Sequence, residues 1–335
     1  MVISDKQELR RCVKQCVRRA SVCEAELAFD VMTGDLGIEA MLDVWARSAS
    51  SPSESLRRSC ADQTPFAPDA VAMFAALDAM NFPRHDLDRA QAMERSYDRS
   101  AYIREVLDVM RARCVLVRVQ LDQADQTAFD DDRLQPLLDV PASVFAPGRY
   151  GVDYAQAAKR ISDAAAMCGA RNVRLSAFDE QALRYCLLPV CQDAGLSLHI
   201  HLKNEEELER FAFLLDAFDG VHALVSTVHD LQRRLISLAS RRVRMLVALS
   251  DVSLLGEALA MLGTSRIVPY SARTSLPELM LGRWVNAREN IWQALCEAYL
   301  PLARAGYELQ SAAIERDVNR LLCGNLLSLC LPQEV

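Results

Sequence analysis

Two histidines lie two residues apart in one apolar segment. Side chains of a β-strand alternate between its two faces, so in LSLHIHL (196–202) His199 and His201 share one face and the apolar residues share the other. Imidazole is a general acid or base and a common metal ligand. His229, which follows the next apolar segment, is a third candidate for the same site. Two interpretations stay open: a metal or sugar site, or polar residues satisfied by hydrogen bonds inside a core.

Eight short apolar or β-branched segments could form the sheet that carries these histidines. From residue 114 onward they alternate with amphipathic segments, a pattern typical of parallel βαβ units in an open sheet or a closed barrel. The earlier segment VCEAELAF would supply an eighth strand and close the barrel. We therefore predict an α/β fold, a (β/α)8 TIM barrel, with its site at the carboxyl ends of the strands. The predicted strands are VCEAELAF (22–29), CVLVRVQ (114–120), ASVFA (142–146), NVRLSAF (172–178), LSLHIHL (196–202), VHALVST (221–227), VRMLVAL (243–249) and SRIVPY (265–270).

Helical sequence flanks the predicted strands. One TIM-barrel domain, residues 1–335, is expected, because such a barrel uses about 250 residues plus insertions. Residues 35–111 form a predicted helical insertion after the first strand. After the last strand we predict a long helix that ends at Gly306 and a second helix that breaks at Gly324.

The composition excludes several classes of protein. Hydrophobic residues make up 51% of the chain and the mean hydropathy is +0.02, enough apolar surface for a large core. The net charge is -7 and the arginines are dispersed, so no nucleic acid is expected as a partner. The eleven cysteines contain no CxxC pair, which favours reduced thiols over disulfides or a zinc site. Without a signal peptide or a run of about 18 apolar residues, the expected location is the cytoplasm and no membrane is expected as a partner.

The segment that begins with LGTSRIVPYSART and runs through the second C-terminal helix resembles uronate isomerases of the amidohydrolase superfamily. In one bacterial branch of that family, strand eight reads much like LGTS followed by Phe-Ile-Pro-Gln-His-Ser-Asp-Ala-Arg. Weaker similarities follow in the right order: AFDDDRLQPLL (128–138), CLLPVCQDAGLSL (186–198) and ALVSTV (223–228). The resemblance covers residues 100–325 and implies the same barrel, with His199 in the place of the family's strand-five histidine.

The residues that hold the metal in that family are absent from the corresponding places of this sequence. The family's His-x-His at the end of strand one corresponds to Ala25 and Leu27, and its strand-eight aspartate, a metal ligand and proton-transfer group, corresponds to Ala272. Neither alanine nor leucine can ligate, and a catalytic divalent metal needs about three protein ligands. The resemblance therefore implies a site without the family's metal and without its base for aldose–ketose interconversion.

The same alignment brings Tyr270, Ser271 and Arg273 to the carboxyl end of strand eight. The guanidinium of Arg273 could bind a carboxylate through two hydrogen bonds, and a salt bridge to Asp251 is the alternative. The candidates are His199, Tyr270 and Arg273 for catalysis and His201, His229, Ser271 and Arg273 for substrate binding. No metal or other cofactor is expected; the alternative is zinc or another divalent metal on His199, His201 and His229. His85 and His222 are interpreted as structural or surface residues.

Three hypotheses for function remain. The first is a catalytically degenerate uronate-isomerase-like barrel, a pseudoenzyme that binds a small sugar acid, another carboxylate or a partner. The second is an active aldose–ketose isomerase or metal-dependent hydrolase with a site rebuilt around His199 and His201. The third is an interaction protein that uses residues 35–111 to bind a protein partner or a second copy of the chain.

Overall fold

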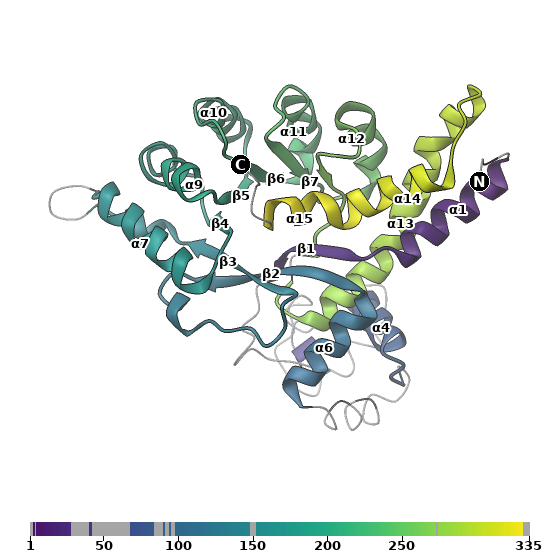
Figure 1. Cartoon of the computed structure of the whole chain (residues 1–335), viewed down its shortest axis with the longest axis horizontal. Helices are drawn as coiled ribbons and strands as arrows, with labels where there is room; N and C mark the ends of the chain where they lie inside the picture. Colours follow the sequence, from purple (N-terminus) through teal and green to yellow (C-terminus); the bar gives the residue numbers. More distant parts are fainter. Residues whose placement is uncertain are drawn as a thin grey trace.

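Eight parallel strands follow one another in sequence order around a curved, TIM-barrel-like sheet (Figure 1). Each connection returns the chain to the start of the next parallel strand. Most of these connections contain α-helices, whereas the connection between β2 and β3 contains the short 3-10 helix η1 (Ala124–Gln126). The strands are β1 (Val22–Leu27), β2 (Ala112–Gln120), β3 (Leu134–Val140), β4 (Asn172–Leu175), β5 (Ser197–Leu202), β6 (Ala223–Thr227), β7 (Met245–Ala248) and β8 (Ile267–Val268). The computed structural model describes residues 3, 5–27, 40–41, 68–83, 90, 94, 98–147, 152–272 and 274–330.

Helices cover the outer face of the sheet (Figure 1). Local side chains determine where these helices begin, as α10 shows. The Asn204 side chain accepts a hydrogen bond from the Glu207 amide at 2.9 Å, and the Glu207 side chain accepts one from the Lys203 amide. The two side chains together cap the start of α10. None of the helices in the described part of the chain combines the length and the apolar character needed to cross a bilayer. The helices are α1 (Lys6–Arg19), α4 (Pro68–Ala79), α6 (Arg99–Met110), α7 (Tyr154–Cys168), α8 (Glu180–Ala182), α9 (Leu188–Ala194), α10 (Glu205–Asp216), α11 (Gln232–Ala239), α12 (Leu255–Leu262), α13 (Pro277–Arg304), α14 (Ser311–Asn319) and α15 (Asn325–Cys330), with π-helical turns η3 (Leu183–Leu187) and η6 (Arg320–Gly324).

Seven of the eight predicted strands are confirmed, and the prediction of a strand at residues 142–146 is wrong. That segment is a short 3-10 helix, η2 (Ala142–Phe145), and the third strand is β3, which precedes it. This strand was not predicted because its sequence contains a proline, which normally removes a hydrogen bond from the sheet. Pro136 is tolerated here, since β3 begins to pair with β4 only at Leu137 and the missing N–H removes no bond on that side.

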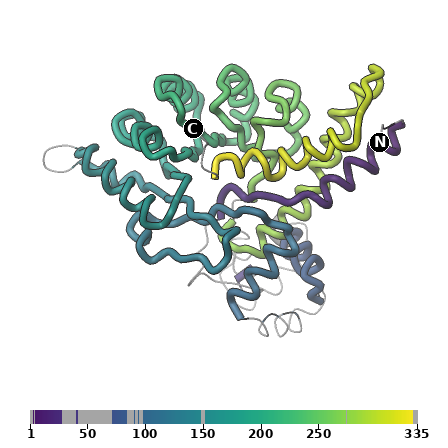
Figure 2. Tube along the Cα trace, viewed as in Figure 1, coloured from purple at the N-terminus to yellow at the C-terminus, as the bar shows by residue number. Residues whose placement is uncertain are grey.

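The amino end of the barrel is closed by the end of the described chain. The long helix after β8 ends as predicted, with Gly306 at φ 81°, and the predicted break at Gly324 is the π-helical turn η6 between α14 and α15. In Figure 2, α14 lies beside α1 and the yellow C-terminal segment crosses the middle of the molecule. Side chains of η6 and α15 fill the interior together with strand residues, as Cys323, Leu326 and Leu329 pack against Cys23, Ala25, Cys114, Leu116, Leu137, Leu224, Leu246 and Val268.

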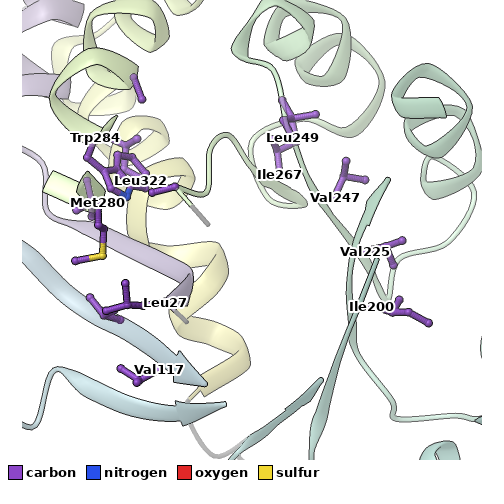
Figure 3. Packing of buried hydrophobic residues seen from close by; sticks show 14 of the residues in the cluster. Leu27, Val117, Ile200, Val225, Val247, Leu249, Ile267, Met280, Trp284 and Leu322 are labelled. Carbon is purple, nitrogen blue, oxygen red and sulfur yellow. The ribbon is translucent and has the colours of Figure 1, made fainter. Parts of the chain in front are cut away.

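A second apolar layer lies between the strands and the surrounding helices. Figure 3 shows part of this layer, where Val225, Val247 and Ile267 of neighbouring strands point away from the barrel interior. Within residues 35–111, the helices α4 and α6 are described, and both pack against α13. A Cβ at Gly282 of α13 would overlap the carbonyl oxygen of Ala72 in α4, so glycine is required where these helices meet.

One buried carboxylate joins β1 to the chain that follows β8. Glu24 is fully buried and accepts hydrogen bonds from the Ser271 hydroxyl at 2.6 Å and from the Ala272 amide at 2.8 Å. The indole N–H of Trp284, in α13, donates to the same carboxylate at 2.8 Å, and the Glu26 amide donates at 3.1 Å. Burial raises the pKa of Glu24 above its usual range, and these four hydrogen bonds act in the opposite direction. Among the described residues, β1 and this segment share one backbone bridge, from Leu27 to Thr274. The hydrogen bonds of Glu24 are therefore a main connection between the first strand and the chain that follows the last strand.

Replacing Glu24 by glutamine should lower the free energy of unfolding by about 2 kcal/mol, because the amide nitrogen must then face at least one buried N–H donor. Urea denaturation measures this change. The control is Glu257→Gln, which removes an exposed carboxylate paired with Arg233 and should change stability by less than about 1 kcal/mol. Equal, small losses in the two variants would contradict a structural role for the buried carboxylate.

Candidate functional site

The carboxyl ends of the strands surround a small polar cavity. It is lined by His199, His201, Glu26, Arg174, Ser226 and Ser271, together with apolar atoms of Ala25, Ile200, Leu224 and Ala248. Its volume is about 20 Å³, which is room for one water molecule. The side chains at this end of the barrel therefore contact one another and leave little free space between them.

Four charged side chains form a closed ion-pair network beside this cavity. Asp139 accepts from Arg118 Nη2 and from Arg174 Nη1, each at 2.7 Å. Glu26 lies 3.1 Å from Arg174 Nε and 3.7 Å from Arg118 Nη1. Asp139 is almost completely buried, whereas about a fifth of the Glu26 side chain is exposed. The network is electrically neutral, and Glu26 is its more accessible carboxylate.

An irregularity in β1 directs Glu26 into the barrel. The pairing of β1 with β2 shifts register between Glu24 and Leu27, as in a β-bulge, where one extra residue is accommodated and side chains are redirected. Ala25 and Glu26, although consecutive, both line the cavity, and Leu27 packs in the layer beneath the helices. Of the two places that correspond to the family's His-x-His, only that of Ala25 therefore faces the site.

Both predicted strand-five histidines line the cavity, and both have hydrogen-bond partners. His199 Nε2 lies 3.1 Å from the side-chain oxygen of Asn172, which requires a proton on that nitrogen. His201 Nδ1 lies 3.1 Å from the Ser226 hydroxyl, which itself donates to the Ile200 carbonyl at 3.3 Å. In this arrangement the Ser226 hydroxyl accepts a hydrogen bond from His201 Nδ1.

The remaining predicted residues lie in different places. The Tyr270 ring packs edge-on against Trp284 with ring centroids 5.3 Å apart, and it lines a neighbouring surface pocket, whereas Ser271 lines both that pocket and the cavity. His229 is exposed, with Nδ1 3.8 Å from Asp251, and does not line the cavity. His222 is half-buried, and burial lowers its pKa. Arg273 and His85 lie outside the described residues.

The donor atoms at this mouth do not fit a divalent metal. Glu26 and Asp139 are each bound to two guanidiniums, and the two imidazoles are bound to Asn172 and Ser226. Within the described ranges, no group of three or more His, Cys, Asp or Glu side chains is arranged to hold a metal ion. The strand order and the location of this polar mouth define the class of protein as a TIM-barrel-like α/β protein.

The fold is that of the uronate isomerases. A uronate isomerase from Bacillus halodurans superimposes with a TM-score of 0.83 over 98% of this chain and 97% of that chain, at 14% sequence identity. A uronate isomerase from Thermotoga maritima gives a TM-score of 0.66 at 9% identity, over 96% of this chain and 97% of the other. Glucuronate isomerase from Caulobacter crescentus gives 0.67 at 10% identity, over 97% and 94% of the two chains. No family model and no curated protein matches the sequence. The predicted uronate-isomerase-like fold is therefore confirmed by structure, at very low sequence identity.

The four residues of the ion-pair network were not among the residues predicted for the site. The signal was present for two of them, because Arg118 shares a strand face with Cys114 and Leu116 in CVLVRVQ, and Arg174 follows Asn172 by two residues in NVRLSAF. A charged residue on the inward face of a barrel strand requires a partner. Asp139 lies in β3, a strand that was not predicted, so no face of the barrel could be assigned to it.

Loss of the buried acid Asp139 should destabilise the protein more than loss of an exposed acid. Asp139→Asn removes the charge that faces two guanidiniums, so we expect a loss of about 3 kcal/mol in the free energy of unfolding. The matched control is Asp216→Asn, which breaks an exposed pair with Arg242 and should cost less than about 1 kcal/mol. Chemical denaturation of both variants at neutral pH tests this difference. If Asp139→Asn were as mild as its control, the network would contribute little to the barrel.

Proposed function

We propose that this chain is a catalytically degenerate uronate-isomerase-like protein that binds a small carboxylate, such as a sugar acid, at the carboxyl mouth of the barrel. The observation that carries the proposal is the ion-pair network of Glu26, Arg118, Asp139 and Arg174 at the place where a metal-dependent barrel of this fold would gather its metal ligands. Guanidiniums are suited to binding carboxylates through paired hydrogen bonds.

A ligand carboxylate would enter this network by replacing Glu26. The contact between Glu26 and Arg118 is long, at 3.7 Å, and Arg118 Nε is buried without a hydrogen-bond partner. A buried donor without a partner costs free energy, so an incoming acceptor at this nitrogen would be favoured. The net charge of the network would not change, because the Glu26 carboxylate would leave Arg118 and Arg174 as the ligand carboxylate binds to them. Movement of Glu26 would also enlarge the small cavity.

The absence of turnover is inferred from the side chains that occupy the mouth. Aldose–ketose interconversion requires a group that removes a proton from one sugar carbon and returns it to the next. Ala272 has no titratable group, and the Ser271 hydroxyl beside it is committed to Glu24. The Glu26 and Asp139 carboxylates are each paired with two guanidiniums, and the His199 and His201 rings are hydrogen-bonded to Asn172 and Ser226.

The purified protein should leave D-glucuronate and D-galacturonate unconverted, with or without added zinc or manganese. A coupled assay for the ketose product and NMR of the sugar after long incubation would measure this. Turnover within two orders of magnitude of about 10 per second, a typical enzymatic rate, would contradict the proposal and favour an isomerase with a rebuilt site.

Binding can be tested separately by exploiting the competition with Glu26. Glu26→Gln should bind D-glucuronate at least about tenfold more tightly than the unaltered protein, a gain of about 1.4 kcal/mol, whereas Arg174→Met should lose binding. His199→Ala and His201→Ala should weaken binding, and His229→Ala, which alters an exposed side chain outside the cavity, should leave it unchanged. Calorimetric titration gives the affinities, and D-glucose, which lacks the carboxylate, is the matched ligand control.

Two outcomes of this titration contradict the binding proposal. Equal affinity for D-glucuronate and D-glucose would mean that the carboxylate is not recognised. Unchanged affinity in Arg174→Met, with the fold verified by circular dichroism, would mean that the ligand binds elsewhere.

A further inference from the structure

Four thiols meet at the amino end of the barrel, opposite the candidate carboxylate site. The Sγ atoms of Cys23, in β1, and Cys323, in η6, are 2.9 Å apart. The Sγ atoms of Cys114, in β2, and Cys330, in α15, are 3.8 Å apart. All four cysteines are buried and are free thiols. The two residues of the closer pair are separated by 300 positions in sequence, so the contact joins the first strand to the helices that fill the barrel.

Cys323 also lines a large surface pocket that is rich in arginine. The pocket has a volume of about 780 Å³, and its lining residues include Arg19, Arg113, Arg316 and Arg320 next to Cys323. No carboxylate occurs among its described lining residues, although the chain as a whole carries a net charge of -7. Arg316 has a long contact of 3.8 Å with Asp317, and within the described residues the other three arginines form no ion pair. This local excess of positive charge attracts anions.

We propose that Cys323 and Cys23 form a thiol–disulfide exchange couple whose substrate is a small anionic disulfide held by the arginine-lined pocket. The two observations that support it are independent: one is the approach of two sulfur atoms, and the other is the charge of the pocket that one of them borders. Neither feature belongs to the carboxylate site at the other end of the barrel.

The exchange has two balanced steps. The Cys323 thiolate attacks one sulfur of the small disulfide, which forms a mixed disulfide and releases the first small thiol after protonation. Cys23 then loses its proton and attacks Cys323 Sγ, which forms the Cys23–Cys323 bond and breaks the mixed disulfide, and the departing second small thiolate takes up a proton. In sum, two protein thiols are oxidised to one disulfide while one small disulfide is reduced to two thiols, and the reverse reaction uses the same atoms.

The surroundings of Cys323 favour its role as the attacking thiol. The hydrogen bond with Cys23 lowers the pKa of the Cys323 thiol, and the charge of Arg113 adds to this effect, whereas burial opposes it. A lowered pKa increases the fraction of thiolate, which is the nucleophile. Cys23, which is less exposed and does not border the pocket, is suited to the second, intramolecular step.

The decisive experiment compares two disulfides of opposite charge on the reduced, full-length protein. Oxidised glutathione, an anionic disulfide, should react at least about tenfold faster than cystamine, a cationic one, at low ionic strength. The difference should shrink at about 1 M salt, where screening acts over about 3 Å. Peptide mapping should find the Cys23–Cys323 disulfide. Equal rates for the two reagents, or a product that lacks this disulfide, would overturn the proposal.

Single-cysteine variants show which thiol acts in each of the two steps. Cys23→Ser should stop the reaction at a mixed disulfide on Cys323, and Cys323→Ser should abolish it. Cys330→Ser is the matched control, because Cys330 belongs to the same thiol cluster but does not border the pocket, and it should react as the unaltered protein does. Arg113→Gln combined with Arg320→Gln should remove most of the preference for the anionic reagent. If Cys23→Ser does not fold, the comparison of reagents on the unaltered chain still decides the question.

Discussion

Burial of the Glu24 carboxylate is the constraint on which the closure of the barrel and the geometry of its mouth both depend. A carboxylate removed from water must recover its lost hydration from hydrogen bonds, and here the donors come from β1, from the segment after β8 and from α13. The same contacts fix Ser271 and Trp284, and Trp284 in turn holds the Tyr270 ring at its edge. The register shift of β1 follows directly after Glu24 and brings Glu26 into the barrel.

The two ends of the barrel are filled in different ways. At the amino end, apolar side chains and thiols of η6 and α15 pack against the strand interiors, and packing of this kind tolerates substitutions of similar volume. At the carboxyl end, the filling is an ion-pair network in which each carboxylate requires its guanidinium partners. A single substitution there leaves a partly buried charge without compensation. We therefore expect the carboxyl end to tolerate substitutions less well than the amino end.

The strands that alternate with amphipathic helices could be predicted from sequence, and so could the inward direction of His199 and His201. Within a single segment, the periodicity of apolar residues indicates both that a strand forms and which of its side chains point inward. It failed at β3, because Pro136 lowers the strand propensity of a segment that tertiary pairing nevertheless selects. Glu26 could not be predicted to face inward, because simple alternation places Ala25 and Glu26 on opposite faces and the register shift overrides it. Long-range partners, such as Glu24 with Trp284, leave no local pattern in the sequence.

The charge balance at the mouth shows how buried carboxylates of a barrel can be neutralised by side chains alone. Two guanidiniums carry the same formal charge as one divalent cation, so Arg118 and Arg174 neutralise Glu26 and Asp139 without a metal. A guanidinium, however, offers no open coordination position and remains protonated in proteins, so it cannot generate a bound hydroxide or polarise a sugar carbonyl as a metal does. It retains the capacity to bind a carboxylate. On the proposed function, electrostatic compensation and ligand recognition thus persist together after the elements of catalysis are gone.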